Sequence, residues 1–259
     1  MTTEKTTAVS TKMAPLAELQ TSLETRKNTY KAILPKHVPM DRFVRSVVIA
    51  AARTPALLNA DRSSLFLAVQ QACQLGLDCS GTLGSAYLIP YGGKVTLVIG
   101  YKGLLDLARR GGDLASINAQ VVYSKDTFNV KMGTEGAIEH VPNFGSDRGD
   151  MVCAYAVVTL KNGEKMFEVM TKGEIEAIRK RSKAGNSGPW VTDTGQMWRK
   201  TVIRRILNYV GMNPDLMTAI TIENAHENDE AESINAAQEV AGFATLEVDS
   251  ETVETPPQG

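Results

Sequence analysis

The residue types that most often perform catalysis or hold metals are few and widely spaced in this sequence. There are three His, at positions 37, 140 and 226, and three Cys, at positions 73, 79 and 153. None of them has the spacing of a zinc site, and no two Cys form a CxxC pair. We therefore assign no catalytic residue and expect no metal-binding residue in the chain.

The sequence also lacks the common motifs for nucleotide binding and for a nucleophilic serine, and its carboxylates form no motif. The segment Gly92-Gly93-Lys94-Val95 has neither the spacing nor the hydroxyl of the phosphate loop GxxxxGK[ST]. No GxSxG elbow is present, and no GxGxxG motif follows a predicted strand. Five scattered carboxylates are interpreted mostly as caps and turn residues: Asp106, Asp113, Asp126, Glu139 and Asp150. A nuclease that uses such carboxylates remains an alternative.

The distribution of charge is more informative than the net charge of −1. All 28 Lys and Arg lie in residues 1–205 with 18 of the 29 acidic residues, so this body carries a net charge of +10. Residues 206–259 hold the other 11 acidic residues and no Lys or Arg. A basic body indicates a surface that binds polyanions, and an acidic tail indicates a separate interaction or autoinhibitory segment.

The basic excess is greatest in residues 171–205, where nine Lys and Arg accompany three acidic residues. Trp190 lies there in a Gly-rich loop, where packing and base stacking explain it equally well. At helical spacing Trp198 falls in an apolar stripe, while Lys200 and Arg204 lie on the opposite side. Four tyrosines precede this segment at strand-like positions: Tyr87, Tyr91, Tyr101 and Tyr123. Cations that follow phosphates and rings that stack on bases are typical of single-strand binding.

Periodicity and turn residues predict the elements that must position these side chains. The first part of the chain favours helices over 16–30, 42–53 and 63–75, with Asp41 and Asp61 as N-caps. The middle favours a hairpin over 86–100, a helix over 101–110, and strands over 116–124, 151–160 and 165–171. Thr171 and Glu174 fit a capping box for the helix 172–183, and a last long helix follows over 193–210. The fold class is therefore α+β: N-terminal helices, a small antiparallel sheet with hairpins, and C-terminal basic helices.

Two long blocks resemble a known family. They are AYLIPYGGKVTLVIGYKGLLDLARRGG and IEAIRKRSKAGNSGPWVTDTGQMWRKTVIRR, with a further match in LPKHVPMDRFVRSVV. Together they are similar to the RecT family of phage and prophage single-strand annealing proteins, over roughly residues 30–215. Gly195-Gln196 departs from the acidic residues expected there, and the acidic tail has no such match.

The resemblance implies a binding protein without covalent catalysis, which anneals DNA strands in recombination and repair without ATP. It implies single-stranded DNA and annealed duplex as ligands, a partner 5′→3′ exonuclease, and assembly into rings or helical filaments. It implies no required cofactor, although Mg²⁺ assists annealing in the family. We also expect a cytoplasmic protein with no membrane contact, and count a host single-strand-binding protein among its candidate partners.

Carried over to this sequence, the resemblance gives nine DNA-binding positions: Lys94, Tyr101, Lys102, Arg181, Lys183, Trp190, Lys200, Arg204 and Arg205. We expect residues 1–13 to be disordered, residues 14–222 to form the annealing and oligomerisation domain, and residues 223–259 to form a disordered acidic tail. Besides the nuclease, one further alternative stays open. It is an interaction scaffold whose basic face meets an acidic protein.

Overall fold

The computed structural model describes residues 15–145, 147–182, 185–210 and 213–227. These residues form two compact units, the first reaching Gly103 and the second beginning at Leu104. The boundary between the units falls within helix α5 (Tyr101–Arg110). Residues 1–13 and 228–259, for which we expect disorder, lie outside the described residues.

The first unit begins with helices. Residues 15–25 are helical, and they are followed by α2 (Lys27–Ile33), α3 (Met40–Arg53), the 3-10 helix η1 (Pro55–Asn59) and α4 (Arg62–Leu75). Asp61 caps α4 as predicted, because its side chain accepts a hydrogen bond from the Ser64 amide. The assignment of Asp41 as the N-cap of α3 is wrong. Pro39 is the N-cap, and Asp41 lies in the first turn, where its carboxylate is 2.8 Å from Nζ of Lys27.

The antiparallel hairpin of the first unit comprises β1 (Ala86–Tyr91) and β2 (Lys94–Ile99), as predicted. Gly92 and Gly93 form its turn with φ of 56° and 84°, a conformation that glycine adopts without strain. One face of the hairpin is buried and contacts α4. Its residues alternate along both strands as the pleat requires: Ala86, Leu88, Val95, Leu97 and Ile99.

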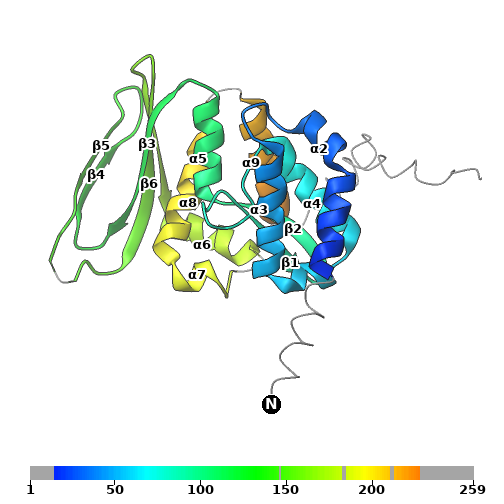
Figure 1. Ribbon diagram of the computed structural model, residues 1–259. Helices are drawn as coiled ribbons and strands as arrows, with labels where there is room; N and C mark the ends of the chain where they lie inside the picture. The colour runs from blue at the N-terminus through cyan, green and yellow to red at the C-terminus, as the bar shows by residue number, and fades with distance from the viewer. Residues whose placement is uncertain (1–14, 146, 183–184, 211–212, 228–259) are drawn as a thin grey trace, which may run out of the picture. The chain divides into compact units, whose positions relative to one another are not determined.

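The second unit is built on a three-stranded antiparallel sheet with the order β3-β6-β7, of which Figure 1 labels β3 and β6. Its strands are β3 (Leu114–Tyr123), β6 (Met151–Leu160) and β7 (Lys165–Thr171). Helix α8 (Thr194–Leu207) packs on this sheet. The small buried side chains of Ala154 and Ala156 on β6 have no exposed surface.

A second, two-stranded sheet was not predicted from the sequence. It consists of β4 (Thr127–Lys131) and β5 (Ala137–Val141), paired so that Phe128 lies opposite His140. The ring of Phe128 stacks on that of Tyr155 of β6, with 5.5 Å between the centroids. Most residues of the β4–β5 hairpin remain exposed, so its strands lack the strong apolar alternation that identifies a strand from sequence.

The remaining helices of the second unit are α6 (Lys172–Arg181), α7 (Pro189–Thr192) and α9 (Pro214–Glu227). The capping box of α6 forms as predicted, with both the Thr171 and the Glu174 side chains bonded to backbone amides. Helix α9 reaches Glu227, so residues 223–227, assigned from sequence to the tail, are helical. The α+β class is confirmed.

The three cysteines are all buried and unpaired: Cys73 and Cys79 in the first unit and Cys153 in the second. Burial raises the pKa of Cys73 to about 12, and it raises the pKa of Cys79 and of Cys153 as well. The prediction that Cys73 is a small core residue is confirmed. In the described ranges, no helix is both long and apolar enough to cross a bilayer.

Candidate nucleic-acid interface

The cations predicted on α8 are largely engaged inside their own unit. Lys200 forms an ion pair with Glu223 of α9, and Arg204 is buried. Arg205 keeps 41% of its side chain exposed, but its Nε atom lies 3.0 Å from Oε1 of Glu168. Its Nη1 atom lies 2.8 Å from Oε1 of Glu174. The positive charge of this helix is therefore substantially balanced by carboxylates of the same unit.

Trp190 and Trp198 are both core residues. Trp190 lies in the short helix α7 and is 3% exposed, which favours packing over base stacking. Trp198 is 1% exposed, as the apolar stripe predicted. Neither ring presents a face on which a base could stack without rearrangement.

Exposed cations of the second unit lie on α6. Lys172, Lys180 and Arg181 are exposed and form no ion pair with any residue that the structure describes. Arg179 is held inward instead, because its Nε atom donates to the Gly185 carbonyl at 2.7 Å. Lys183 lies outside the described residues. Among the predicted cations of the second unit that the structure describes, Arg181 is therefore the one most available to a polyanion.

In the first unit, the face of the β1–β2 hairpin that points away from α4 carries rings and a cation. The outer face is defined by the register, which places Tyr87 opposite Val98, Ile89 opposite Thr96 and Tyr91 opposite Lys94. Tyr87 is 38% exposed, and Lys94 is exposed at the turn. Tyr101 and Lys102 begin α5 after the far end of β2, about 17 Å along the strand from Lys94.

Arg53 joins this region although no sequence motif marks it. Its Nη1 atom donates to the Ser80 carbonyl at 3.0 Å and to Oγ1 of Thr82 at 3.3 Å. The partners are 27 and 29 residues away, so only the fold brings them together. The glycines in the segment SGTLGS, residues 80–85, are the one signal that could have indicated it. We refer to this segment as the 80–85 loop.

Two glycines hold the 80–85 loop against the start of α5. A Cβ atom at Gly100 would lie 2.1 Å from the Gly84 carbonyl oxygen. A Cβ atom at Gly103 would lie 2.2 Å from the Ser85 carbonyl oxygen. Real Cβ atoms do not approach oxygen so closely, so both positions require glycine for the two backbones to touch. The loop and Lys102 are thereby fixed side by side.

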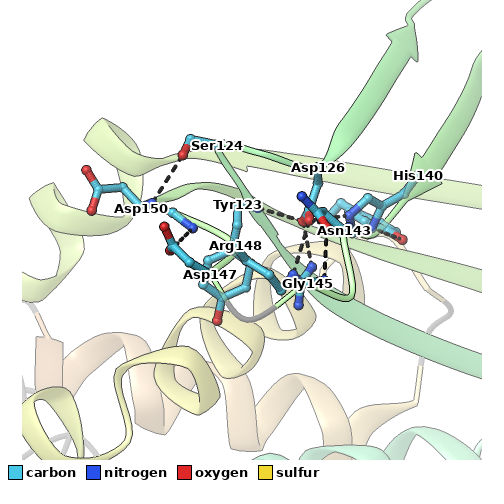
Figure 2. A network of polar contacts seen from close by, with 11 residues as sticks. Tyr123, Ser124, Asp126, His140, Asn143, Gly145, Asp147, Arg148 and Asp150 are labelled. Carbon is cyan, nitrogen blue, oxygen red and sulfur yellow. Dashed lines mark hydrogen bonds and ion pairs between the residues drawn. The ribbon is translucent and has the colours of Figure 1, made fainter.

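A polar network centred on Asp126 anchors the β4–β5 hairpin (Figure 2). The Asp126 side chain has no exposed surface, and its carboxylate accepts hydrogen bonds from Nε and Nη2 of Arg148 at 3.1 and 2.5 Å. It also accepts from the backbone amides of Tyr123 and Asn143, each at 2.9 Å. The Arg148 guanidinium and these amides hold the pKa of Asp126 far below its ordinary value.

His140 extends the network toward the three-stranded sheet. A carboxylate only accepts hydrogen bonds, so Nε2 of His140 donates to Oδ2 of Asp126 across 3.1 Å. The other ring nitrogen lies 3.2 Å from the hydroxyl oxygen of Tyr155. The network thus connects three segments: strand β5, strand β6 and the turn that follows β3. Asp126 is therefore a structural residue.

The other scattered carboxylates give no sign of a catalytic group. Asp106 pairs with Arg110 one turn along α5, at 2.5 Å. Among the described residues, no three His, Cys, Asp or Glu lie close enough to hold a metal ion.

Exposed rings and cations on the first unit and exposed cations on the second are features that nucleic-acid-binding proteins share. Residues 41–240 match the RecT family, and the chain belongs to it. Protein RecT of Escherichia coli (strain K12) is 40% identical over 205 residues, which cover 76% of each chain. The uncharacterized protein YqaK of Bacillus subtilis (strain 168) is 28% identical over 197 residues, covering 76% of this chain and 68% of that protein.

Membership of the RecT family confirms the resemblance seen in the sequence. It makes the chain a protein of DNA recombination and strand annealing.

Proposed function

We propose that the protein binds single-stranded DNA and anneals it to a complementary strand without ATP. The observation that carries this proposal is the outer face of the β1–β2 hairpin. There, exposed Tyr87 and Lys94 lie on one surface, with Arg53 and Lys102 near its end. Flat rings can stack on bases and cations can pair with phosphates. Because the sequence has no phosphate-loop motif, we propose that these contacts act without ATP hydrolysis.

In this proposal the substrate is the strand exposed by a partner 5′→3′ exonuclease, and the product is the annealed duplex. No group of the chain needs to form a covalent bond in the process. Mg²⁺ would act by screening the two phosphate backbones rather than at a dedicated site. The interaction with a host single-strand-binding protein and the location in the cytoplasm are part of the same proposal.

Self-assembly on the DNA is also part of the proposal, because many copies can hold one strand in a common register. Exposed large apolar side chains concentrate in residues 130–152 of the described chain: Val130, Met132, Val141, Phe144 and Val152. By comparison, the helices before residue 76 contribute one such side chain, Ile49. Subunit interfaces through the β4–β5 region are therefore better supported.

An annealing assay with complementary oligonucleotides, one of them labelled, tests the function. Without ATP, we expect duplex to form above the spontaneous rate, and no strand to be cut. Cleavage would support the nuclease instead, and neither duplex nor cleavage would support the scaffold.

The same oligonucleotides test whether the cations of α6 contact DNA, through the salt dependence of binding. Binding should weaken with salt, and replacing Lys180 and Arg181 with Gln should reduce the salt slope by roughly 0.7 for each phosphate that is no longer neutralised. The matched control is Lys165→Gln, an exposed cation at the start of β7. Equal slopes for the wild type and the double variant would exclude α6 from the interface.

A further inference from the structure

Tyr87 is an exposed ring held in a fixed position. Its backbone lies opposite Val98 of β2 on one side and is bridged to Ser80 on the other. Both flanks of its strand segment are therefore paired, which fixes the backbone and the direction of the Cα–Cβ bond that orients the ring.

The ring itself lies among three glycines. Cβ atoms built on Gly81, Gly84 and Gly100 would lie 3.4 Å from Cε1, 3.4 Å from Oη and 3.3 Å from Cε2 of Tyr87. The ring is therefore seated against bare backbone along both edges and at its hydroxyl. Gly81 and Gly84 have φ of 75° and 70°, values that side-chain-bearing residues rarely adopt. We call this arrangement the glycine seat.

The ring is not a core residue despite these neighbours. It keeps 38% exposure, and its hydroxyl makes no hydrogen bond with any described residue. A tyrosine retained for packing alone is usually buried, with its hydroxyl bonded. A fixed ring that remains open to solvent is instead suited to stacking on another flat group.

Two cations border the same glycine seat. Nη1 of Arg53 lies 3.8 Å from the Cβ position of Gly81, and Cδ of Lys102 lies 3.4 Å from that of Gly84. Arg53 is oriented by its bonds to Ser80 and Thr82, and neither cation forms an ion pair within the described part of the chain. The nearby carboxylate of Asp78 is engaged with Ser80 instead. The ring thus has one cation beside its Cε1 edge and a second cation near its hydroxyl.

We infer that Tyr87, Arg53 and Lys102 form a nucleotide subsite for single-stranded DNA. Tyr87 stacks on one base, and the two cations contact the phosphates that flank it. Stacking on an open ring accepts every base, so the subsite reads no sequence. This inference rests on the proposed function, because it names the residues through which the strand is held.

The test compares a short oligothymidylate with an abasic phosphodiester of equal length. Tyr87→Ala should weaken oligothymidylate binding about 5- to 150-fold, the range for one stacked base, and leave abasic binding unchanged. Tyr87→Phe should bind both like the wild type. Arg53→Gln and Lys102→Gln should each weaken the binding of both ligands and lower the salt slope of that binding.

Tyr209→Ala is the matched control, because this ring is 68% exposed and follows α8 in the second unit, so it is not part of the glycine seat. It should leave both affinities unchanged. Thermal melts of each variant show whether the fold is intact.

A second measurement keeps the inference testable if Tyr87→Ala does not fold. Both native tryptophans are buried, so a Tyr87→Trp ring would be the exposed fluorophore. Its emission should be quenched by oligothymidylate and not by the abasic strand. Equal quenching by both strands, or none at saturation, would overturn the inference.

Failure of the inference and failure of the function are distinguishable. If the wild type anneals and Tyr87→Ala binds both ligands normally, the subsite is wrong and the function stands. If the wild type binds neither ligand, both are wrong.

Discussion

Nζ of Lys200 lies 2.7 Å from Oε2 of Glu223, and their side chains are only 15% and 6% exposed. A cation in the most basic segment of the sequence thus fastens α8 to α9. The ion pair therefore contributes first to the stability of the fold, and it affects DNA binding only indirectly.

Lys200→Ala should therefore lower the free energy of unfolding by about 1.5–3 kcal/mol, the range for a hydrogen bond to a charged group. Urea denaturation checks this. The control is Lys180→Ala on α6, an exposed residue that should change stability by less than about 0.5 kcal/mol. A stable Lys200→Ala protein with a reduced salt slope for DNA binding would show that the lysine contacts DNA.

Trp190→Ala should destabilise the protein by about 3–5 kcal/mol, because truncating a buried aromatic ring removes its packing and leaves a cavity. Scanning calorimetry measures the loss, and an oligonucleotide titration below the melting transition measures affinity. Tyr209→Ala, at an exposed ring, should melt like the wild type. A normal melting temperature with weakened binding would restore Trp190 as a stacking residue.

Gly100→Ala should cost at least about 1–3 kcal/mol, because the added methyl group meets the Gly84 carbonyl and the two backbones must separate. Gly195→Ala is its control. Nothing lies within 4 Å of a Cβ there, and the residue is in α8, so alanine should stabilise by roughly 0.5–1 kcal/mol. Chemical denaturation of both variants gives the comparison, and an unaffected Gly100→Ala protein would contradict the close approach.

Asp126→Asn should be most destabilising at neutral pH. The pKa of Asp126 is lowered on folding, so its stabilisation is present above the unfolded value of about 3.9 and is lost as the pH falls toward the folded value. The difference in unfolding free energy between wild type and variant should therefore shrink between pH 7 and pH 3. Urea titrations at the two pH values measure it. A difference that grows in acid would contradict the ionised, paired state.

Phe144→Ser should reduce assembly on long single strands without changing stability, because the side chain is 89% exposed. Sedimentation velocity with and without the strand reports the oligomer, and a thermal melt reports the fold. Tyr209→Ser provides an exposed control outside residues 130–152. If the Phe144 variant assembles normally, the subunit interface must be sought elsewhere.

Features set by neighbours in the chain were predictable from sequence. The hairpin over 86–100, the Asp61 cap and the Thr171–Glu174 box each depend on residues within a few positions, and all are present. The β4–β5 hairpin was missed because Arg148, 22 residues from Asp126, provides much of what holds it. The ion pair of Lys200, which the sequence gives as a DNA-binding position, is not predictable for the same reason, since Glu223 approaches it only in the fold.

The candidate site divides in the same way. Lys94, Lys102 and Arg181 were selected from motifs and prove to be exposed. Arg53 could not be selected, because its relation to the 80–85 loop is created by the packing of α3 on residues distant in sequence. Local pattern identifies which residues carry charge, whereas tertiary packing decides which charges remain available.

The burial of all three cysteines has a practical consequence. Only the thiolate form reacts with maleimides, and burial both raises the thiol pKa and blocks access. We therefore expect the native protein to react very slowly with thiol-directed dyes. A single cysteine introduced at an exposed position such as Tyr209 would accept a fluorophore selectively. Single-molecule recordings of strand pairing could then use this chain without removing any native cysteine.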